Sequence, residues 1–218
     1  MTEKIDVVLA DDHEIILDAL KHRLAAEPDI DVVATAHTAD EAIDVCLEHR
    51  PDVVVMDINM PGMICFDAAK RIMSASTQTR VVFLSGFIQD GYIDRALKVK
   101  AWGYLAKTSP TPQLVDAIRQ VARGRVYFSS EVQSRMVVDP GETTLEGEKN
   151  TLLSTLTNRE LEVLLYVARG LSKKEIASTM HVSVKTVEGH TEKLMTKVDI
   201  HDRVELALFA VRENLVHL

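Results

Sequence analysis

The sequence predicts two domains, an α/β domain built on a five-stranded parallel sheet and a small all-α domain behind it. Three observations support this. The first 125 residues alternate short β-branched runs with amphipathic helical stretches, residues 139–150 are polar and acidic, and no strand pattern follows residue 150. Because strands that alternate with helices form parallel sheets covered on both faces, the first part is expected to be doubly wound.

The elements of the first domain follow from their local patterns. The strands are expected at Ile5–Ala10, Val32–Ala36, Val53–Met56, Val81–Leu84 and Gly103–Leu105, and the helices at residues 14–26, 39–49, 66–75, 90–100 and 111–123. Thr38 followed by Glu41 is a capping-box pattern for the second helix. Right-handed crossovers leave few topologies, and we predict the flavodoxin-like strand order 2-1-3-4-5.

A change of composition separates this domain from the rest of the chain. A short helix is expected over Glu131–Val137, and the stretch "DPGETTLEGEKN" (139–150) has too few apolar residues to order itself, which predicts a flexible linker. Four helices are expected after it, at Asn158–Ala168, Lys173–Met180, Val184–Val198 and Asp202–Glu213. The predicted division is therefore residues 1–127, 128–150 and 151–218.

Charge and cysteine content limit the possible functions. The net charge of −8 argues against binding membranes or nucleic acid through bulk charge, and the last 68 residues are neutral overall. The N-terminus lacks a signal-peptide pattern, and no apolar run is long enough to span a membrane. Cys46 and Cys65 follow no metal-binding spacing, so both are expected to be reduced thiols of a cytoplasmic protein.

Acidic residues end two of the predicted strands. Asp11 and Asp12 follow "IDVVLA", and Asp57 follows "VVVM". Since parallel strands end at one edge of the sheet, these carboxylates should converge, and they would raise each other's pKa without a cation. Mg²⁺ suits such oxygen ligands. Ser85 and Lys107 end two further strands, and a hydroxyl and an ammonium beside Mg²⁺ indicate a site for a transferred phosphoryl group.

Four segments, "VVLADDH", "VVVMDINMPGM", "VVFLSGF" and "GYLAKTS", resemble the signature segments of a response-regulator receiver domain. The resemblance implies that Asp57 accepts a phosphoryl group from a partner histidine kinase, so that the protein is a phosphoacceptor with at most slow self-dephosphorylation. It further implies Mg²⁺ bound by Asp57 and Asp12 directly, by Asp11 through water and by the backbone carbonyl of Asn59. Lys107 and Ser85 would contact the phosphoryl oxygens, and Tyr104 would rotate inward as Ser85 moves. His13 is interpreted as a residue of the loop or helix start.

Four positions depart from the receiver pattern. Ile64 and Cys65 stand where the family usually has Asp-Gly, Gly86 stands where alanine is more frequent, and Thr108 follows Lys107 where an acid is frequent. None of these changes removes a catalytic group. They are expected to affect the conformation of the loop beside Asp57 and the lifetime of the phosphorylated state.

The last domain contains a helix-turn-helix pattern, with Ser172 and Ser183 as N-caps of its two helices. "LTNRELEVL", "GLSKKEIA" and "SVKTVEGHTEKLMTKV" resemble the LuxR-type DNA-binding domain of NarL/FixJ-family response regulators. The resemblance implies a recognition helix at Val184–Lys197. The expected DNA contacts are Lys173, Lys174, Ser183, Lys185, Thr186, His190, Lys193 and Lys197, and the expected core residues are Leu161, Val163, Leu164, Ile176, Val187 and Leu194.

The balanced charge of this domain predicts weak DNA binding by one copy. The final helix has a stripe of Val204, Ala207, Leu208 and Val211 at helical spacing. The resemblance implies that this helix pairs two copies on phosphorylation or on DNA. Three alternatives remain open: an aspartate-based phosphatase, which would need a general acid where Asn59 stands; a switch whose helical domain binds a protein; and a regulator that acts without phosphorylation.

Overall fold

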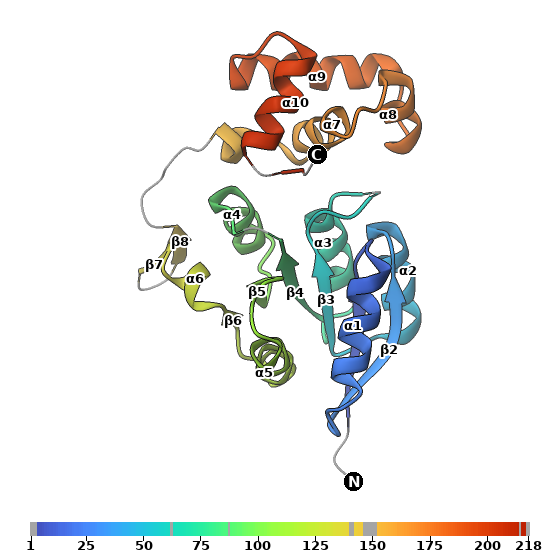
Figure 1. The fold of residues 1–218 in the computed structure, drawn as a ribbon, viewed down its shortest axis with the longest axis vertical. Coiled ribbons are helices and arrows are strands. Elements are labelled where there is room, and N and C mark those ends of the chain that lie inside the picture. Colours follow the sequence, from blue (N-terminus) through green and yellow to red (C-terminus); the bar gives the residue numbers. More distant parts are fainter. Residues whose placement is uncertain are drawn as a thin grey trace. The chain divides into compact units, whose positions relative to one another are not determined.

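The computed structural model describes residues 4–61, 63–86, 88–139, 142–145, 152–213 and 215–216. The chain forms two compact units, residues 1–148 and 149–218. The strands of the first unit are β1 (Ile5–Ala10), β2 (Ile30–Ala36), β3 (Val53–Asp57), β4 (Arg80–Ser85), β5 (Gly103–Ala106) and β6 (Tyr127–Phe128). They form one parallel sheet in the order β2-β1-β3-β4-β5-β6 (Figure 1). The predicted order 2-1-3-4-5 is confirmed.

Five helices connect these strands: α1 (Glu14–Leu24), α2 (Ala39–His49), α3 (Cys65–Ala75), α4 (Asp90–Lys98) and α5 (Thr111–Ala122). On one face of the sheet, Leu17 of α1 and Ile118 of α5 share a core with Val55 of β3. On the other face, the Phe66 ring of α3 packs edge-on against Phe83 of β4 at 5.0 Å. Helices therefore cover both faces, as the unbroken apolar strands predict.

The capping prediction at α2 is nearly right. The Thr38 hydroxyl accepts the Glu41 backbone N–H at 3.1 Å, as expected. The Glu41 carboxylate, however, accepts the N–H of His37 at 2.7 Å, one residue before the position that a capping box requires.

The segment after α5 differs from the prediction. A sixth strand, β6, pairs with Gly103 and Tyr104, and the short helix is α6 (Ser130–Gln133), which ends four residues before the expected end. Two strands then form an antiparallel pair: β7 (Met136–Asp139), which overlaps the end of the expected helix, and β8 (Glu142–Leu145), which lies in the predicted linker. Residues 140, 141 and 146–150 of that linker lie outside the described residues. Hydrogen bonds between their backbones hold β7 and β8 together, although their composition predicts no apolar core.

The second unit is helical throughout its described residues. It contains the 3-10 turn η1 (Leu152–Thr155) and the helices α7 (Asn158–Ala168), α8 (Lys173–Thr179), α9 (Val184–Val198) and α10 (Arg203–Arg212). Ser172 and Ser183 cap α8 and α9 as predicted, and Ser172 completes a capping box with Glu175. All six predicted core residues of this unit are buried. In the described part of the chain, each helix is too short or too polar to cross a membrane.

Candidate functional site

The acidic residues at the strand ends meet in one pocket. Asp11 follows β1 and Asp57 ends β3, and each side chain is 3% exposed. Asp12 is more exposed. Ligating atoms of Asp11, Asp12, His13 and Asp57 all lie within 4.8 Å of one another. The convergence predicted from the strand ends is therefore present.

One lysine is shared between two of these carboxylates. The Lys107 Nζ lies 2.6 Å from Asp11 Oδ2 and 3.0 Å from Asp57 Oδ2. The loop that carries Lys107 is fixed by a hydrogen bond from its backbone N–H to the Ser85 carbonyl at 2.6 Å. The ammonium thus contacts two carboxylates, and with Asp12 close to both the pocket holds three acids and one lysine.

The pKa values reflect that excess of acids. Burial raises the pKa of Asp57 above its ordinary value, the Lys107 ammonium partly offsets this, and the Asp11 carboxylate raises it further. Burial alone would lower the pKa of Lys107, but the charges of Asp57 and Asp11 outweigh burial and raise it. The lysine therefore stays charged, and the ionised form of Asp57 is disfavoured in this pocket relative to water.

A metal ion fits the donor set that remains. Asp57 Oδ1 is buried and accepts no hydrogen bond from any residue in the described ranges. Buried acceptors are normally satisfied, so this oxygen is available to a further cation. The oxygen atoms of Asp11, Asp12 and Asp57 are of the type that hard divalent cations prefer.

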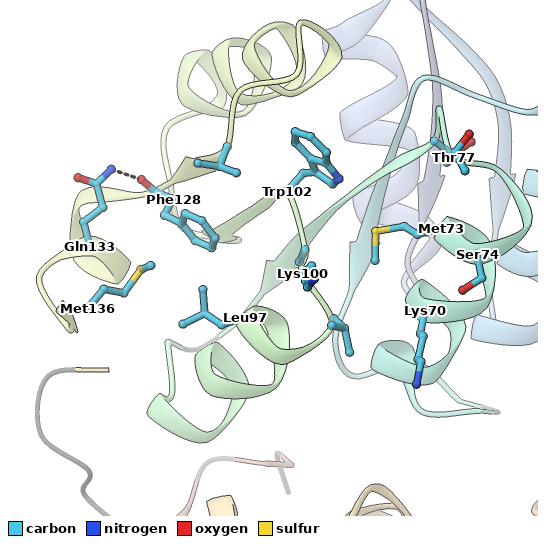
Figure 2. Close-up of a pocket in the computed structure, with 14 residues that line it drawn as sticks. Lys70, Met73, Ser74, Thr77, Leu97, Lys100, Trp102, Phe128, Gln133 and Met136 are labelled. Carbon is cyan, nitrogen blue, oxygen red and sulfur yellow. Dashed lines mark hydrogen bonds between the residues drawn. The ribbon is translucent and has the colours of Figure 1, made fainter. Parts of the chain in front are cut away.

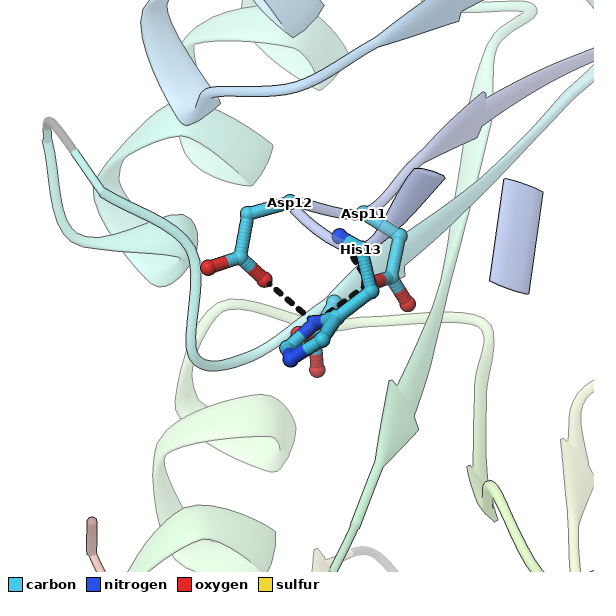
Figure 3. Close-up of side chains that lie close together, drawn as sticks. Asp11, Asp12 and His13 are labelled. Carbon is cyan, nitrogen blue, oxygen red and sulfur yellow. Dashed lines mark hydrogen bonds and ion pairs between the residues drawn. The ribbon is translucent and has the colours of Figure 1, made fainter. Parts of the chain in front are cut away.

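His13 is the member of the cluster whose place the sequence did not reveal. Its Nδ1 lies 2.9 Å from Asp12 Oδ1 and 3.1 Å from Asp11 Oδ1, so the ring lies against both carboxylates (Figure 3). The imidazole is 64% exposed. The sequence predicts a loop or helix-start residue here, and His13 does occupy the N-cap position of α1. The missed signal was its direct adjacency to two acids.

Ser85 and Tyr104 lie side by side behind the pocket. Both are fully buried, and their side chains share a hydrogen bond. Burial raises the pKa of Tyr104. Asn59, on the loop after β3, accepts a hydrogen bond at Oδ1 from the Tyr92 hydroxyl of α4 at 3.1 Å. Tyr92, which the sequence did not single out, therefore links α4 to the loop that carries Asn59.

The departures from the receiver pattern lie close to Asp57. Cys65 is the first residue of α3 and is buried, and burial together with the Asp57 charge raises the pKa of its thiol. Cys46 is buried too, which raises its pKa to about 12. Both cysteines are free, as predicted. At Gly86, an added Cβ would meet no atom within 4 Å, so the expected space is present.

The residues expected to touch DNA are spread over α8 and α9, and most are accessible. Lys174, Lys185, Thr186 and Lys193 are exposed, and His190 is half-buried. Two others have partners within the unit: Lys173 Nζ lies 3.0 Å from the Glu188 carboxylate, and the Ser183 hydroxyl caps α9.

Lys197 is placed differently from the expectation. Its Nζ donates to Glu160 Oε2 at 2.7 Å and to the Thr155 carbonyl at 2.9 Å. Glu160 is buried, and its carboxylate also accepts the Thr157 backbone N–H at 2.8 Å. Burial raises the pKa of Glu160, but the bonds from Lys197 and Thr157 outweigh this and lower it. Lys197 thus connects α9 to the start of α7.

Known proteins match both parts of the chain. A family described as response regulator receiver domain matches residues 7–119, and one described as bacterial regulatory proteins, luxR family, matches residues 154–210. Transcriptional regulatory protein LiaR of Bacillus subtilis is 34% identical over 98% of this chain and 100% of its own length. Oxygen regulatory protein NreC of Staphylococcus epidermidis is 35% identical over 96% of this chain and 98% of its own.

A solved structure shares the fold at low identity. RcsB from Salmonella enterica serovar Typhimurium, bound to promoter rprA with the phosphomimetic BeF₃⁻, superposes with a TM-score of 0.70 at 20% identity, covering 95% of this chain and 98% of RcsB. Receiver fold, acidic pocket and helix-turn-helix together define a two-component response regulator. This chain belongs to the NarL/FixJ family of response regulators, which join a receiver domain to a LuxR-type DNA-binding domain.

Proposed function

We propose that Asp57 accepts a phosphoryl group from a partner histidine kinase in a Mg²⁺-dependent reaction, and that this controls dimerisation and DNA binding. The observation that supports this most is the buried, unpaired Oδ1 of Asp57 within an excess of carboxylates. Asp57 and Asp12 would hold Mg²⁺ directly, with Asp11 acting through water and Asn59 through its backbone carbonyl. Bound there, Mg²⁺ would neutralise charge on the transferred group.

The side chains around Asp57 have separate roles in this reaction. A carboxylate oxygen of Asp57 attacks the phosphorus as the bond to the kinase imidazole breaks, and the imidazole leaves with the electron pair. Lys107 is already charged and 3.0 Å from Asp57, so it stabilises the equatorial oxygens without moving far. The Ser85 hydroxyl can donate to another oxygen, which would release its bond with Tyr104 and pass the change to β5.

For DNA binding we propose a smaller contact set than the motif implies. Lys174, Lys185, Thr186, His190 and Lys193 remain the DNA-contacting residues. Lys173 would have to exchange Glu188 for a phosphate, and Ser183 acts first as a helix cap. Lys197 is assigned a supporting role because its ammonium is bound to Glu160.

Dimerisation follows from the weakness of this contact set. Each phosphate contact adds to affinity, and a single copy has few. Val204 and Leu208 lie one turn apart on α10 and are 66% and 42% exposed, so they offer an apolar surface to a second copy. Two linked copies on paired half-sites would bind with the added advantage of high effective concentration.

The test is a promoter mobility-shift assay with the full chain, with and without acetyl phosphate and Mg²⁺. Phosphorylation should tighten binding of the parent and leave Asp57→Asn unchanged, and Val204→Glu should reduce the gain. Equal tightening in Asp57→Asn would favour regulation without phosphorylation at this site. Absence of binding to any promoter fragment at low salt would favour a protein partner for the helical domain.

A further inference from the structure

The receiver unit contains a cavity of about 950 Å³ away from the acidic pocket (Figure 2). It lies between the last turns of α3, the end of α4, β6 and the α6–β7 segment. Thr79 and Trp102 line it and directly precede β4 and β5, so it lies at the amino edge of the sheet. Asp57 ends its strand at the opposite, carboxyl edge. The cavity is therefore a separate site.

The lining is largely apolar. Its larger apolar members include Met73, Leu97, Val99, Trp102, Phe128 and Met136. Small-molecule sites have this character and a volume of roughly 300–1,000 Å³. In Figure 2, Phe128 and Leu97 lie on one side, Met73 of α3 lies on the other, and Trp102 lies between them. An apolar body of two fused or linked rings fits such a space.

The charged groups of the lining are all of one sign. Lys70 and Lys100 are among the fourteen lining residues, and none of the fourteen is acidic, in a chain with a net charge of −8. Neither lysine forms an ion pair with another residue of the described ranges. Both lysines of the lining carry a positive charge, which complements an anionic group on an apolar molecule.

We propose that this cavity binds a small amphipathic anion, with an apolar ring system between α3 and α4 and one sulfonate, carboxylate or phosphate group at Lys70 and Lys100. The bound molecule would join α3 to the end of α4. At the start of α4, the Asp90 carboxylate is paired with Arg135 at 3.0 Å. Holding α4 in this way would influence the switch at Tyr104. That consequence rests on the proposed function, whereas binding itself does not.

The test uses two dyes that differ by one charge, 1-anilinonaphthalene-8-sulfonate and its neutral analogue N-phenyl-1-naphthylamine. Trp102 is the only tryptophan, so energy transfer from tryptophan to dye reports binding beside the cavity. We expect one saturable site in the unphosphorylated full chain. Ser74→Tyr, at an exposed lining position, should weaken both dyes at least about tenfold. Ala75→Tyr, exposed on the same helix outside the lining, should change neither.

The charge is tested separately. The sulfonate should bind about three- to tenfold more tightly than the neutral dye, as expected for two partly exposed charges. The double variant Lys70→Gln, Lys100→Gln should remove that preference, whereas Lys98→Gln, outside the lining, should keep it.

A second variant applies if Ser74→Tyr does not fold. Val126→Glu at the rim should weaken binding of the sulfonate and leave binding of the neutral dye unchanged, with Val126→Gln as the control.

Three results would overturn the proposal: unchanged affinity in the Tyr variant at position 74, equal loss in the control at position 75, or no preference for the anionic dye. None of them bears on phosphorylation of Asp57, which acetyl phosphate labelling measures independently.

Discussion

Each domain contains a lysine bonded to a buried carboxylate, and the two sites differ in how fully that carboxylate is hydrogen-bonded and neutralised. In the helical domain, Lys197 pairs with Glu160, whose carboxylate also accepts the Thr157 N–H, and the pKa of Glu160 is lowered. In the receiver, Lys107 is divided between Asp11 and Asp57, one oxygen of Asp57 has no hydrogen bond within the described ranges, and the pKa of Asp57 is raised.

The difference distinguishes a carboxylate that stabilises the fold from one that is suited to a reaction. A carboxylate whose bonds are complete gains nothing from a further cation, and its lowered pKa marks a contribution to stability. A carboxylate held with too little positive charge costs free energy until a cation arrives, and such perturbed groups gather at functional sites. By this criterion, we propose that Lys107 belongs to a reaction site and that Lys197 supports the fold.

The largest expected effect concerns Mg²⁺. At a concentration one hundred times its Kd, Mg²⁺ should raise the free energy of unfolding of the receiver by about 2.7 kcal/mol. Urea unfolding followed by Trp102 fluorescence measures this. Asp12→Ala should lose most of the gain and bind Mg²⁺ more weakly, whereas Asp94→Ala, an acid paired with Lys98, should retain it. Parental Mg²⁺ affinity in Asp12→Ala would place the metal elsewhere.

The complementary effect is on the helical domain. Lys197→Met removes the ammonium that donates to the buried Glu160 carboxylate. The free energy of unfolding should fall by about 1–3 kcal/mol. Circular dichroism during urea unfolding measures this. Lys193→Met on the same helix should cost less than about 0.5 kcal/mol and weaken DNA binding instead. The reverse pattern would return Lys197 to the DNA contacts.

A smaller effect distinguishes the two acids by pH. Because the pKa of Asp57 is raised in the folded state, ionisation of Asp57 lowers the free energy of unfolding. This cost is absent below the pKa of about 4 in the unfolded chain, and it develops as the pH rises through the pKa in the folded state. Asp57→Asn should therefore be more stable than the parent at pH 7, by about 1 kcal/mol, and the advantage should shrink toward pH 4.

Glu160 should behave in the opposite way. Because its pKa is lowered in the folded state, the Glu160 carboxylate contributes to the free energy of unfolding. This contribution is complete above about pH 4.3 and is lost as the pH falls through the pKa in the folded state. The loss of stability in Glu160→Gln should thus be constant from pH 5 to 7 and diminish only in acid. Parallel pH profiles for the Asn variant at 57 and the Gln variant at 160 would remove the distinction between the two sites.

The smallest effect concerns Gly86, which directly follows Ser85 of the proposed phosphorylation site. Because a Cβ there meets no atom and φ is not positive, Gly86→Ala should raise the free energy of unfolding by about 0.4–1 kcal/mol through the unfolded chain. The lifetime of the phosphorylated state, followed by mass spectrometry, should change if the backbone freedom of glycine matters there. Destabilisation would show that the space is needed.

The sequence predicted those features that depend on strand patterns and strand ends. Unbroken apolar runs fixed β1, β3 and β4, and parallel order then brought Asp11, Asp57 and Lys107 together. It did not predict β6 or the β7–β8 pair, because backbone hydrogen bonds to a neighbour leave no apolar periodicity. Nor could it predict the partner of Lys197, since Glu160 is 37 residues away and a lysine on a recognition helix looks the same whether it faces DNA or a buried acid.

The most direct test of the account is the intact mass of the full chain after incubation with acetyl phosphate. We expect one added phosphoryl group in the parent with Mg²⁺, none with EDTA, and none in Asp57→Asn. The added group should be sensitive to hydroxylamine, as an acyl phosphate is, and Glu160→Gln should be labelled like the parent. Labelling of the Asn variant at the parental level, or labelling that persists without Mg²⁺, would contradict the assignment of the acid-rich pocket as the reaction site.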